Sequence, residues 1–535
     1  MAISTNARQP TSLDELSQRQ RQILELLQAG KVNKEIAREL GISLGTVKQH
    51  VVALFKRLNV KNRAMAVSRG MERRSVPRDE PQSQVIDGQL ERRPCVVLSL
   101  ALPEDAEPRE ARLLHGFMGA IAFDHDALFL ARTGNAGDII FGIRRVSEHD
   151  VLTALRAVRQ LDADMGRGGR MHASLTAGVA VASMLRHGGW SGEAVASATI
   201  STARALLDET PAGMLVLDEP VRDLMRAFGV GRGHDISVQL PLDEIERLVW
   251  TGERAAFAMV GRNVELDRIA KILQGVPGRL LLLAGETGMG KSRLCQEVAD
   301  RYVAQGGHVY YYRCLPGERD NLQLFDTRVG GALSVDDVLA RIPRAGDARM
   351  LLILDDMHLA SEAKAASLLR AATGCVAAGH VVLISSRRRL EMPGAEAITL
   401  GRLAPQEIVR LVASVTGMPK PEQGAIVDVA AGVPLFAVEM ARHTTDEIPL
   451  PLLVVVSARL DSLRLDRQLL QQVARRPDGI DEAGLSAAMV NRHLTDWQPE
   501  LEKAMAGGVI ARRADGRFVV SHPLLRRVID YMVVE

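Results

Sequence analysis

The chain has 535 residues, of which 47% are hydrophobic and 25% are charged, as expected for a globular protein of three or four domains. Its formal net charge is only +2, which excludes a uniform polycation, so any surface for nucleic acid must be local. The four cysteines form no CxxC pair, which argues against a zinc site or a disulfide framework. No apolar run approaches the roughly 18 residues that span a bilayer, and the polar start does not resemble a signal peptide. These features predict a cytoplasmic protein with no membrane partner.

Residues 16–74 are the first segment predicted to fold, and they carry 13 Lys and Arg residues against 4 Glu and no Asp. Apolar residues recur at helical spacing, so that Val47, Val51 and Leu54 share one face of a helix. The opposite face and the helix starts then carry side chains suited to base edges and phosphates. These DNA-binding candidates are Asn33, Lys34, Thr46, Lys48, Gln49, His50 and Val52.

The pieces KVNKEIARELGIS and TVKQHVVALFKRLNV resemble the LuxR-type helix-turn-helix over its full length. The resemblance implies that the segment binds double-stranded DNA and that the second helix of the motif lies in the major groove. RNA polymerase is a further partner that such a regulator would contact. The alternative is a basic helical bundle that binds a protein instead of DNA.

A mixed segment follows, in which strand-like runs such as CVVLSLAL, DIIFGI and SLTAGVAVA alternate with helical stretches such as HDVLTALRAVRQL. The order of RRPCVVLSLAL, TGNAGDIIFG, LTAGVAV and GEAVASATISTARALLDETPAGMLVLDE resembles class III nucleotidyl cyclase homology domains. The resemblance covers residues 92–228 and implies an α+β domain.

The positions that this resemblance implies for catalysis carry unsuitable residues. The two metal-binding Asp positions fall at Ala101 and Asn135, and the phosphate-stabilising Asn and Arg positions fall at Ala196 and Ile200. Asp138 lies nearby, but its spacing is wrong by three residues. Because a methyl group cannot bind magnesium and Ile cannot bridge a phosphate, we predict no cyclase activity. The domain would then serve in packing, dimerisation or sensing, or would bind a small ligand in its former cleft.

The sharpest motif is GxxxxGKS, which runs from Gly285 to Ser292 between a buried strand and a helical run. The backbone N–H groups of such a loop surround phosphate, while Lys291 adds a charge at the β- and γ-phosphates and Ser292 supplies an oxygen to Mg²⁺. The candidates for binding ATP or ADP are Gly285, Glu286, Thr287, Gly288, Met289, Gly290, Lys291, Ser292, Arg293, Arg387 and Pro434.

The run MLLILDDMH supplies the apolar strand ending in acid that the second half of such a site requires. Asp355 is predicted to bind Mg²⁺ through water, beside the oxygen that Ser292 supplies, and Asp356 is the catalytic candidate that positions the attacking water. The alternative is that both are solvated turn acids. The next strand, VVLISSRRR, leads to Arg387, which either contacts the γ-phosphate or is surface charge.

The pieces VGRNVEL, ILDDMHLA, ISSRR, GVPLFAVEM and SHPLLRRVIDYM, together with the GxxxxGKS loop, resemble the AAA-type signal-transduction ATPases with numerous domains (STAND). The resemblance implies that Gly432–Leu435 lies beside the nucleotide in a helical subdomain, and that a winged-helix-like part follows. His522 is expected to be structural. Members often continue into a helical-repeat sensor, which a chain ending at Glu535 would lack.

The expected fold class is multidomain α/β, with an all-α helix-turn-helix bundle, an α+β cyclase-like domain and a parallel-sheet P-loop domain with a helical and winged-helix-like part. The predicted segments are a leader at 1–15, the helix-turn-helix at 16–74, a linker at 75–91, the cyclase-like domain at 92–228, a connector at 229–255, the ATPase domain at 256–401, the helical subdomain at 402–447 and the winged-helix-like domain at 448–535.

These features predict an ATP-dependent bacterial transcription regulator in which slow ATP hydrolysis acts as a switch. ADP would hold a closed monomer, and ATP with Mg²⁺ would favour a dimer or larger homo-oligomer that brings DNA-binding heads together. One alternative is a class III adenylate cyclase under ATPase and DNA-binding control. Others are a signalling scaffold that does not bind DNA, and a P-loop that binds nucleotide without turnover.

Overall fold

A computed structural model of the chain describes residues 89–535 apart from internal gaps and the last residue, together with a few residues nearer the start. The residues outside the description are 133, 166–170, 229, 231–237, 246–258, 276–277, 315–322, 327–331, 335–349, 388–389, 391, 418–422, 444–446, 491–496 and 535, and all of 1–88 except 22–24, 26, 36, 51 and 54. Within the described residues, no helix has both the length and the apolar character needed to cross a bilayer.

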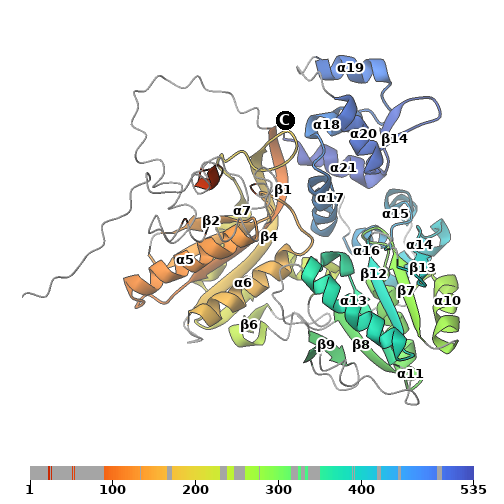
Figure 1. The fold of residues 1–535 in the computed structure, drawn as a ribbon. Coiled ribbons are helices and arrows are strands. Elements are labelled where there is room, and N and C mark those ends of the chain that lie inside the picture. The colour runs from red at the N-terminus through yellow and green to blue at the C-terminus, as the bar shows by residue number, and fades with distance from the viewer. Residues whose placement is uncertain are drawn as a thin grey trace, which may run out of the picture.

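The first large unit is a six-stranded sheet with the order β2-β3-β1-β4-β5-β6 (Figure 1). Its two long strands, β1 and β4, pair antiparallel along their whole length because both are apolar at nearly every inward position. Its strands are β1 (Gln89–Ala101), β2 (Leu128–Ala131), β3 (Ala136–Phe141), β4 (His172–Met184), β5 (Met214–Leu217) and β6 (Gln239–Pro241). Its helices are α5 (Pro108–Asp124), α6 (Asp150–Asp164), α7 (Ala198–Asp208), α8 (Glu219–Phe228) and the short 3-10 helix η2 (Leu242–Glu244).

Two of the predicted boundaries differ from the structure. Residues 239–241 form β6, which pairs antiparallel with β5, so the expectation of a connector from 229 onward is wrong for this strand. Residues 89–91 belong to β1 rather than to the linker predicted at 75–91. Both errors have one cause: these short ends carry mixed polarity, and only their pairing with a neighbouring strand places them in the sheet.

The second unit is a seven-stranded sheet with the order β10-β9-β8-β11-β12-β7-β13. The neighbours β8, β11, β12, β7 and β13 are parallel, as the near-continuous apolar runs predict for strands covered on both faces. The strands are β7 (Arg279–Ala284), β8 (His308–Arg313), β9 (Gln323–Asp326), β10 (Ala332–Ser334), β11 (Met350–Asp355), β12 (Val381–Ser386) and β13 (Glu396–Thr399). The helices are α10 (Asn263–Gln274), α11 (Lys291–Ala304), α13 (Glu362–Ala377) and the 3-10 helix η3 (Met357–Leu359).

The rest of the chain is mainly helical and ends in a two-stranded hairpin followed by one helix. The runs GVIARR and GRFVVS form this hairpin, which lies within the part expected to be winged-helix-like. The helices are α14 (Pro405–Thr416), α15 (Gln423–Ala430), α16 (Pro434–Arg442), α17 (Leu450–Leu463), α18 (Arg467–Ala474), α19 (Glu482–Val490), α20 (Gln498–Ala506) and α21 (Pro523–Met532), and the hairpin strands are β14 (Ile510–Arg512) and β15 (Phe518–Val520).

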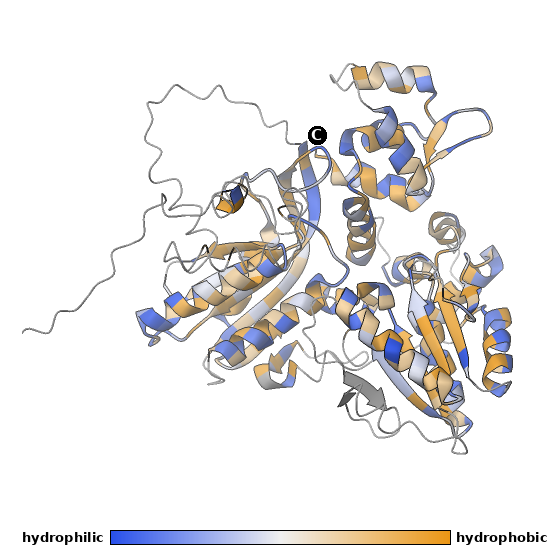
Figure 2. Cartoon of the chain, viewed as in Figure 1, coloured by the Kyte–Doolittle hydropathy of each residue, from blue (hydrophilic) through white to orange (hydrophobic). Residues whose placement is uncertain are grey.

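One hydrophobic core joins the seven-stranded sheet to the C-terminal helices, and Figure 2 shows β7 and β12 as apolar strands at its centre. Helix α17 is buried between this core and the six-stranded sheet, since its Val454 belongs to the core of that sheet. At the other end of α17, Asp461 accepts hydrogen bonds from the fully buried Arg93 of β1, at 3.0 and 2.5 Å, and from Arg467. The six-stranded sheet is therefore fixed to the C-terminal helices by a buried ionic cluster as well as by apolar packing.

Candidate functional site

The GxxxxGKS motif forms a tight loop between β7 and α11, at the carboxyl edge of the parallel sheet. Gly288 and Gly290 have φ angles of 79° and 87°, a conformation that side chains disfavour. A Cβ on Gly288 would also lie only 3.0 Å from Cβ of Leu435. Glycine is needed here both for the backbone conformation and because another segment packs directly on the loop.

Lys291 begins α11 and turns its side chain back into the loop. Its Nζ donates to the carbonyl oxygens of Gly285, at 2.9 Å, and Glu286, at 3.0 Å. Burial lowers the pKa of Lys291, and the carboxylates of Asp356 and Asp355 oppose that shift. The ammonium group is thus held where phosphate oxygens would replace the two carbonyls as its partners.

Asp355 ends β11 and is fully buried. Its carboxylate accepts hydrogen bonds from Tyr311 Oη at 2.9 Å, and from the hydroxyls of Ser385 and Ser292. Burial and the adjacent Asp356 raise the pKa of Asp355. Apart from the backbone N–H of Asp356, its hydrogen-bond donors are neutral hydroxyls, which hold the carboxylate in place without neutralising its charge.

Asp356 lies in the left-handed region with φ of 54°, so the chain turns sharply as it leaves the strand. Its backbone N–H donates to Ser385 Oγ at 2.9 Å. Its carboxylate accepts from Nε of Arg313 at 3.3 Å. The side chain proposed to position water is therefore aimed by the turn and by one arginine from β8.

The segment Gly432–Leu435 packs on the loop, which is where the resemblance to STAND ATPases placed it. The backbone N–H of Leu435 donates to the carbonyl oxygen of Gly288 at 3.2 Å, and Pro434 is the first residue of α16. Gly432 has φ of 82°, and a Cβ there would lie 2.7 Å from the carbonyl oxygen of Leu403. Pro434 lies between Val433 and Leu435, whose side chains are the nearest neighbours of a Cβ placed on Gly288.

Arg387 directly follows β12, and its Nη2 donates to Oε2 of Glu148 at 2.6 Å. Glu148 belongs to the six-stranded sheet domain, in the segment between β3 and α6. The arginine predicted to meet a γ-phosphate therefore already has a carboxylate partner, and that partner comes from another domain.

Sequence reasoning missed several residues around this site. Tyr311 and Arg313 of β8 lie beside Asp355 and Asp356 and donate hydrogen bonds to their carboxylates. Arg262, which belongs to the piece VGRNVEL, donates to the carbonyl oxygens of Met289 at 3.2 Å and Gly401 at 2.6 Å. It therefore links the loop to the segment that follows β13. The alternation of side chains in HVYYYR gave a signal for Tyr311 and Arg313, because both face the same side of the strand.

His522 has the structural role that was expected. Its Nδ1 accepts from the backbone N–H of Leu524 at 3.1 Å and caps helix α21, while Nε2 lies 3.3 Å from the carbonyl oxygen of Ala430. Burial lowers the pKa of His522 to about 4, so the ring is neutral at pH 7.

The DNA-binding candidates Asn33, Lys34, Thr46, Lys48, Gln49, His50 and Val52 lie outside the described residues. The described residues of that segment include Ile23, Ile36, Val51 and Leu54, and all four are buried. Their burial agrees with the apolar faces read from the sequence.

The six-stranded sheet does not bring together the four positions aligned with cyclase catalysis. Ala101 and Asn135 meet at one end of β1, where the Asn135 amide donates to the carbonyl oxygens of Leu102 and, at 2.8 Å, Pro103. Ala196 instead pairs with Val181, which lies opposite Arg92 at the other end of the strand. Asn135 thus closes a loop, and the absence of cyclase activity stays a prediction.

The loop of β7 fits a nucleotide with Mg²⁺ on three observations. Its glycines Gly288 and Gly290 have the positive φ angles that curl the loop, its lysine is turned into the loop, and Ser292 and Asp355 place two oxygen donors together. Hard oxygen donors are the ligands that Mg²⁺ prefers. The buried charge of Asp355, held by hydroxyls, is the feature that a divalent cation would satisfy.

Comparison with known proteins gives two matches along the chain. Residues 14–69 match the luxR family of bacterial regulatory proteins, and residues 276–391 match an AAA domain. The chain is 59% identical over 54 residues to a putative HTH-type transcriptional regulator, YhjB, of Escherichia coli strain K12, over 10% of this chain and 27% of that protein. It is 46% identical over 52 residues to the spore germination protein GerE of Bacillus subtilis, over 10% of this chain and 70% of that protein.

The chain spans only about a quarter of the length of the first curated relatives it matches. Among solved structures, a STAND protein with a tetratricopeptide repeat sensor from Pyrococcus horikoshii aligns at 16% identity over 52% of this chain and 43% of that chain, with a TM-score of 0.27. The adenylyl cyclase CyaB from P. aeruginosa aligns at 13% identity over 26% of this chain and 83% of that chain, with a TM-score of 0.22. At such scores neither likeness assigns a fold or an activity.

Proposed function

We propose that this chain, which belongs through residues 14–69 to the luxR family of bacterial regulatory proteins, is a transcription regulator whose DNA binding is controlled by ATP and ADP at the loop Gly285–Ser292. The observation that carries the proposal is the pairing of that family segment with a loop in which Lys291, Ser292 and Asp355 converge. The match of residues 276–391 to an AAA domain supports the same assignment.

In this proposal the loop amides and Lys291 bind the phosphates, and Pro434 and the start of α16 cover them. Ser292 and Asp355 would hold Mg²⁺, which offsets the negative charge that builds on the phosphates during transfer. Asp356 orients water toward the γ-phosphorus, and ADP and inorganic phosphate leave. Arg313 keeps the Asp356 carboxylate in position, so hydrolysis depends on β8 as well as on the loop.

The nucleotide acts as a switch only if ATP binds one form of the protein more tightly than ADP does. We infer that the ATP form self-associates and the ADP form does not. A single head of about 60 residues binds DNA weakly and mainly through phosphates, so its affinity falls steeply with salt. Joining two heads makes the second contact intramolecular and raises the affinity by about 10² or more.

The proposal is tested by sizing the full chain with ADP and with a non-hydrolysable ATP analogue. A larger species is expected with the analogue alone. Lys291→Ala should remove this response because the phosphates lose their only lysine contact in the loop, whereas the exposed Lys271→Ala on α10 is the matched control and should keep it. An identical size with both nucleotides would refute control by self-association.

The DNA arm is tested in the same samples by footprinting on genomic fragments at moderate salt. Lys48→Ala is expected to weaken protection if Lys48 contacts a base edge. An absence of protection with every nucleotide would favour the signalling scaffold, and protection that Lys48→Ala leaves unchanged would contradict a base contact by Lys48.

A further inference from the structure

The six-stranded sheet domain places one carboxylate at the nucleotide site. Glu148 Oε2 accepts from Arg387 Nη2 at 2.6 Å, and the side chain of Glu148 is only 10% exposed. Arg387 follows the strand that lies between the loop strand β7 and the acid strand β11. The contact thus joins two domains at the edge of the sheet where the γ-phosphate would lie.

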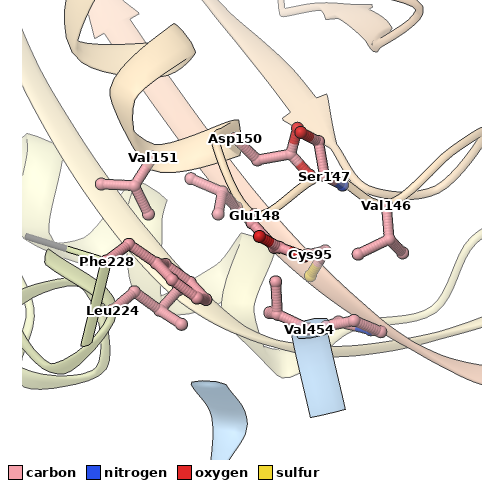
Figure 3. Close-up of a pocket in the computed structure, with 11 residues that line it drawn as sticks. Cys95, Val146, Ser147, Glu148, Asp150, Val151, Leu224, Phe228 and Val454 are labelled. Atoms are coloured by element: carbon pink, nitrogen blue, oxygen red, sulfur yellow. Dashed lines mark hydrogen bonds between the residues drawn. The ribbon is translucent and has the colours of Figure 1, made fainter. Parts of the chain in front are cut away.

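Glu148 is held rigidly by its own neighbours. The backbone N–H of Val146 donates to Oδ2 of Asp461 at 2.8 Å, and that of Ser147 donates to Oδ2 of Asp150 at 3.0 Å. Figure 3 shows the segment from Val146 to Asp150 beside Cys95 of β1, with Val454 of α17 among the residues around it. The loop that carries Glu148 is therefore hydrogen-bonded to α17 on one side and to the start of α6 on the other.

A second hydrogen bond also joins the nucleotide site to the six-stranded sheet domain. Arg313, which holds Asp356, also donates through Nη2 to the carbonyl oxygen of Phe228 at the end of α8, at 3.2 Å. Two arginines at the nucleotide site thus bind the six-stranded sheet domain, one through a carboxylate and one through a backbone carbonyl. Their positions depend on whether that domain is docked.

The charges make this contact sensitive to the γ-phosphate. Glu148 is within electrostatic range of Lys291 and Asp356, whose charges act on it with opposite sign. We expect ADP to leave the pair of Glu148 and Arg387 intact, because ADP lacks the γ-phosphate that Arg387 is predicted to contact. A γ-phosphate brings negative charge beside Glu148 and competes with it for the same guanidinium group.

We propose that Glu148 makes the nucleotide site selective for ADP over ATP, because its carboxylate is bound to Arg387, the side chain that would otherwise bind the γ-phosphate. ATP therefore binds at the cost of the contact between Glu148 and Arg387, and its binding loosens the six-stranded sheet domain from the site. The inference rests on the proposed nucleotide site and names the residue that separates the two nucleotides.

The test compares dissociation constants for ADP and a non-hydrolysable ATP analogue in the full chain and in Glu148→Gln. The variant keeps the shape of the side chain but removes the charge, so the analogue should bind about tenfold more tightly, within the usual range of coupling between sites, while ADP binding changes little. Glu209→Gln, at an exposed residue after α7, is the matched control and should change neither constant.

Glu148→Asp and amide exchange keep the idea falsifiable if the glutamine variant is poorly folded. The aspartate keeps the charge on a shorter side chain, and it should retain part of the preference for ADP. Exchange at the amide of Val146 should be faster with the analogue than with ADP, because the loop is released. An unchanged ratio of the two constants in Glu148→Gln, or equal exchange with both nucleotides, overturns the inference. If the unaltered chain binds neither nucleotide, the proposed function itself fails.

Discussion

Asp355 in the seven-stranded sheet and Asp138 in the six-stranded sheet are both fully buried, but their hydrogen-bond partners differ in charge. Asp138 accepts two hydrogen bonds from Arg204, at 2.9 and 2.6 Å, and one from Ser99 at 2.7 Å. The side-chain donors to Asp355 are the hydroxyls of Tyr311, Ser385 and Ser292. Asp138 is hydrogen-bonded to a guanidinium group, whereas Asp355 is hydrogen-bonded to hydroxyls and Arg313 acts on it only through space.

The hydrogen-bond partners decide which of the two buried acids is available for chemistry. A buried carboxylate paired with arginine has its charge satisfied within the fold, so removing either partner leaves an uncompensated group. A buried carboxylate held by hydroxyls keeps its charge for an added cation. Asp355 is thus the candidate metal ligand, while Asp138 links α7 to the sheet.

The largest expected effect is on hydrolysis. Asp355→Asn keeps the shape and the hydroxyl contacts but removes the negative charge proposed to bind Mg²⁺. We expect ATP hydrolysis to fall by about a hundredfold, a typical effect of losing one electrostatic group at a transition state. Release of phosphate under saturating ATP measures it. Asp138→Asn is the matched control, and equal losses in the two variants would break the distinction between the two acids.

A smaller effect is expected on stability. Asp138→Asn leaves Arg204 without its ionic partner, and because Arg204 is 40% exposed, water compensates in part. We expect the free energy of unfolding to fall by about 1–2 kcal/mol, below the value for a fully buried pair. Denaturant unfolding measures this, with the exposed Asp124→Asn as control. A variant as stable as the unaltered chain would mean that the pair is not structural.

A further effect concerns the pH dependence of stability and adds a third acid to the comparison, the half-buried Asp150. Burial raises the pKa of Asp150 to about 7 from 3.8, and the nearby Asp461 adds to the shift. Between these values the folded chain binds a proton that the unfolded chain has lost, so stability falls as pH rises from about 4 to about 7. Linkage limits the slope to about 1.4 kcal/mol per pH unit.

Asp150→Asn stays neutral at every pH and should remove this contribution while keeping an oxygen for the N–H of Ser147. The difference in unfolding free energy between the two proteins, measured at pH 5 and pH 7.5, isolates the effect. The variant should gain relative stability at the higher pH. A difference that does not change with pH would contradict the raised pKa.

The sequence predicted the parts of the site that local pattern encodes. The GxxxxGKS loop, the apolar strand ending at Asp355 and the strand leading to Arg387 each carry their signal within about ten residues. The buried runs also predicted a parallel sheet, because strands covered on both faces lack the alternation of polar residues.

The contacts that cross domains could not be predicted in the same way. Glu148 and Arg387 are 239 positions apart, and Arg93 and Asp461 are 368 apart. Nothing in the neighbourhood of Glu148 distinguishes it from a solvated acid before a helix. The loop of Glu148 reaches the nucleotide site because α17 packs between two hydrophobic cores. The sequence predicts that α17 is apolar, but it does not predict which surfaces α17 packs against.

The most direct test of the central claim is the affinity of the full chain for a protected DNA fragment, measured at one salt concentration with ADP and with a non-hydrolysable ATP analogue. We expect the DNA to bind more tightly with the analogue, by about a hundredfold or more, and no difference between the nucleotides in Lys291→Ala. Equal affinity with both nucleotides in the unaltered chain would contradict it.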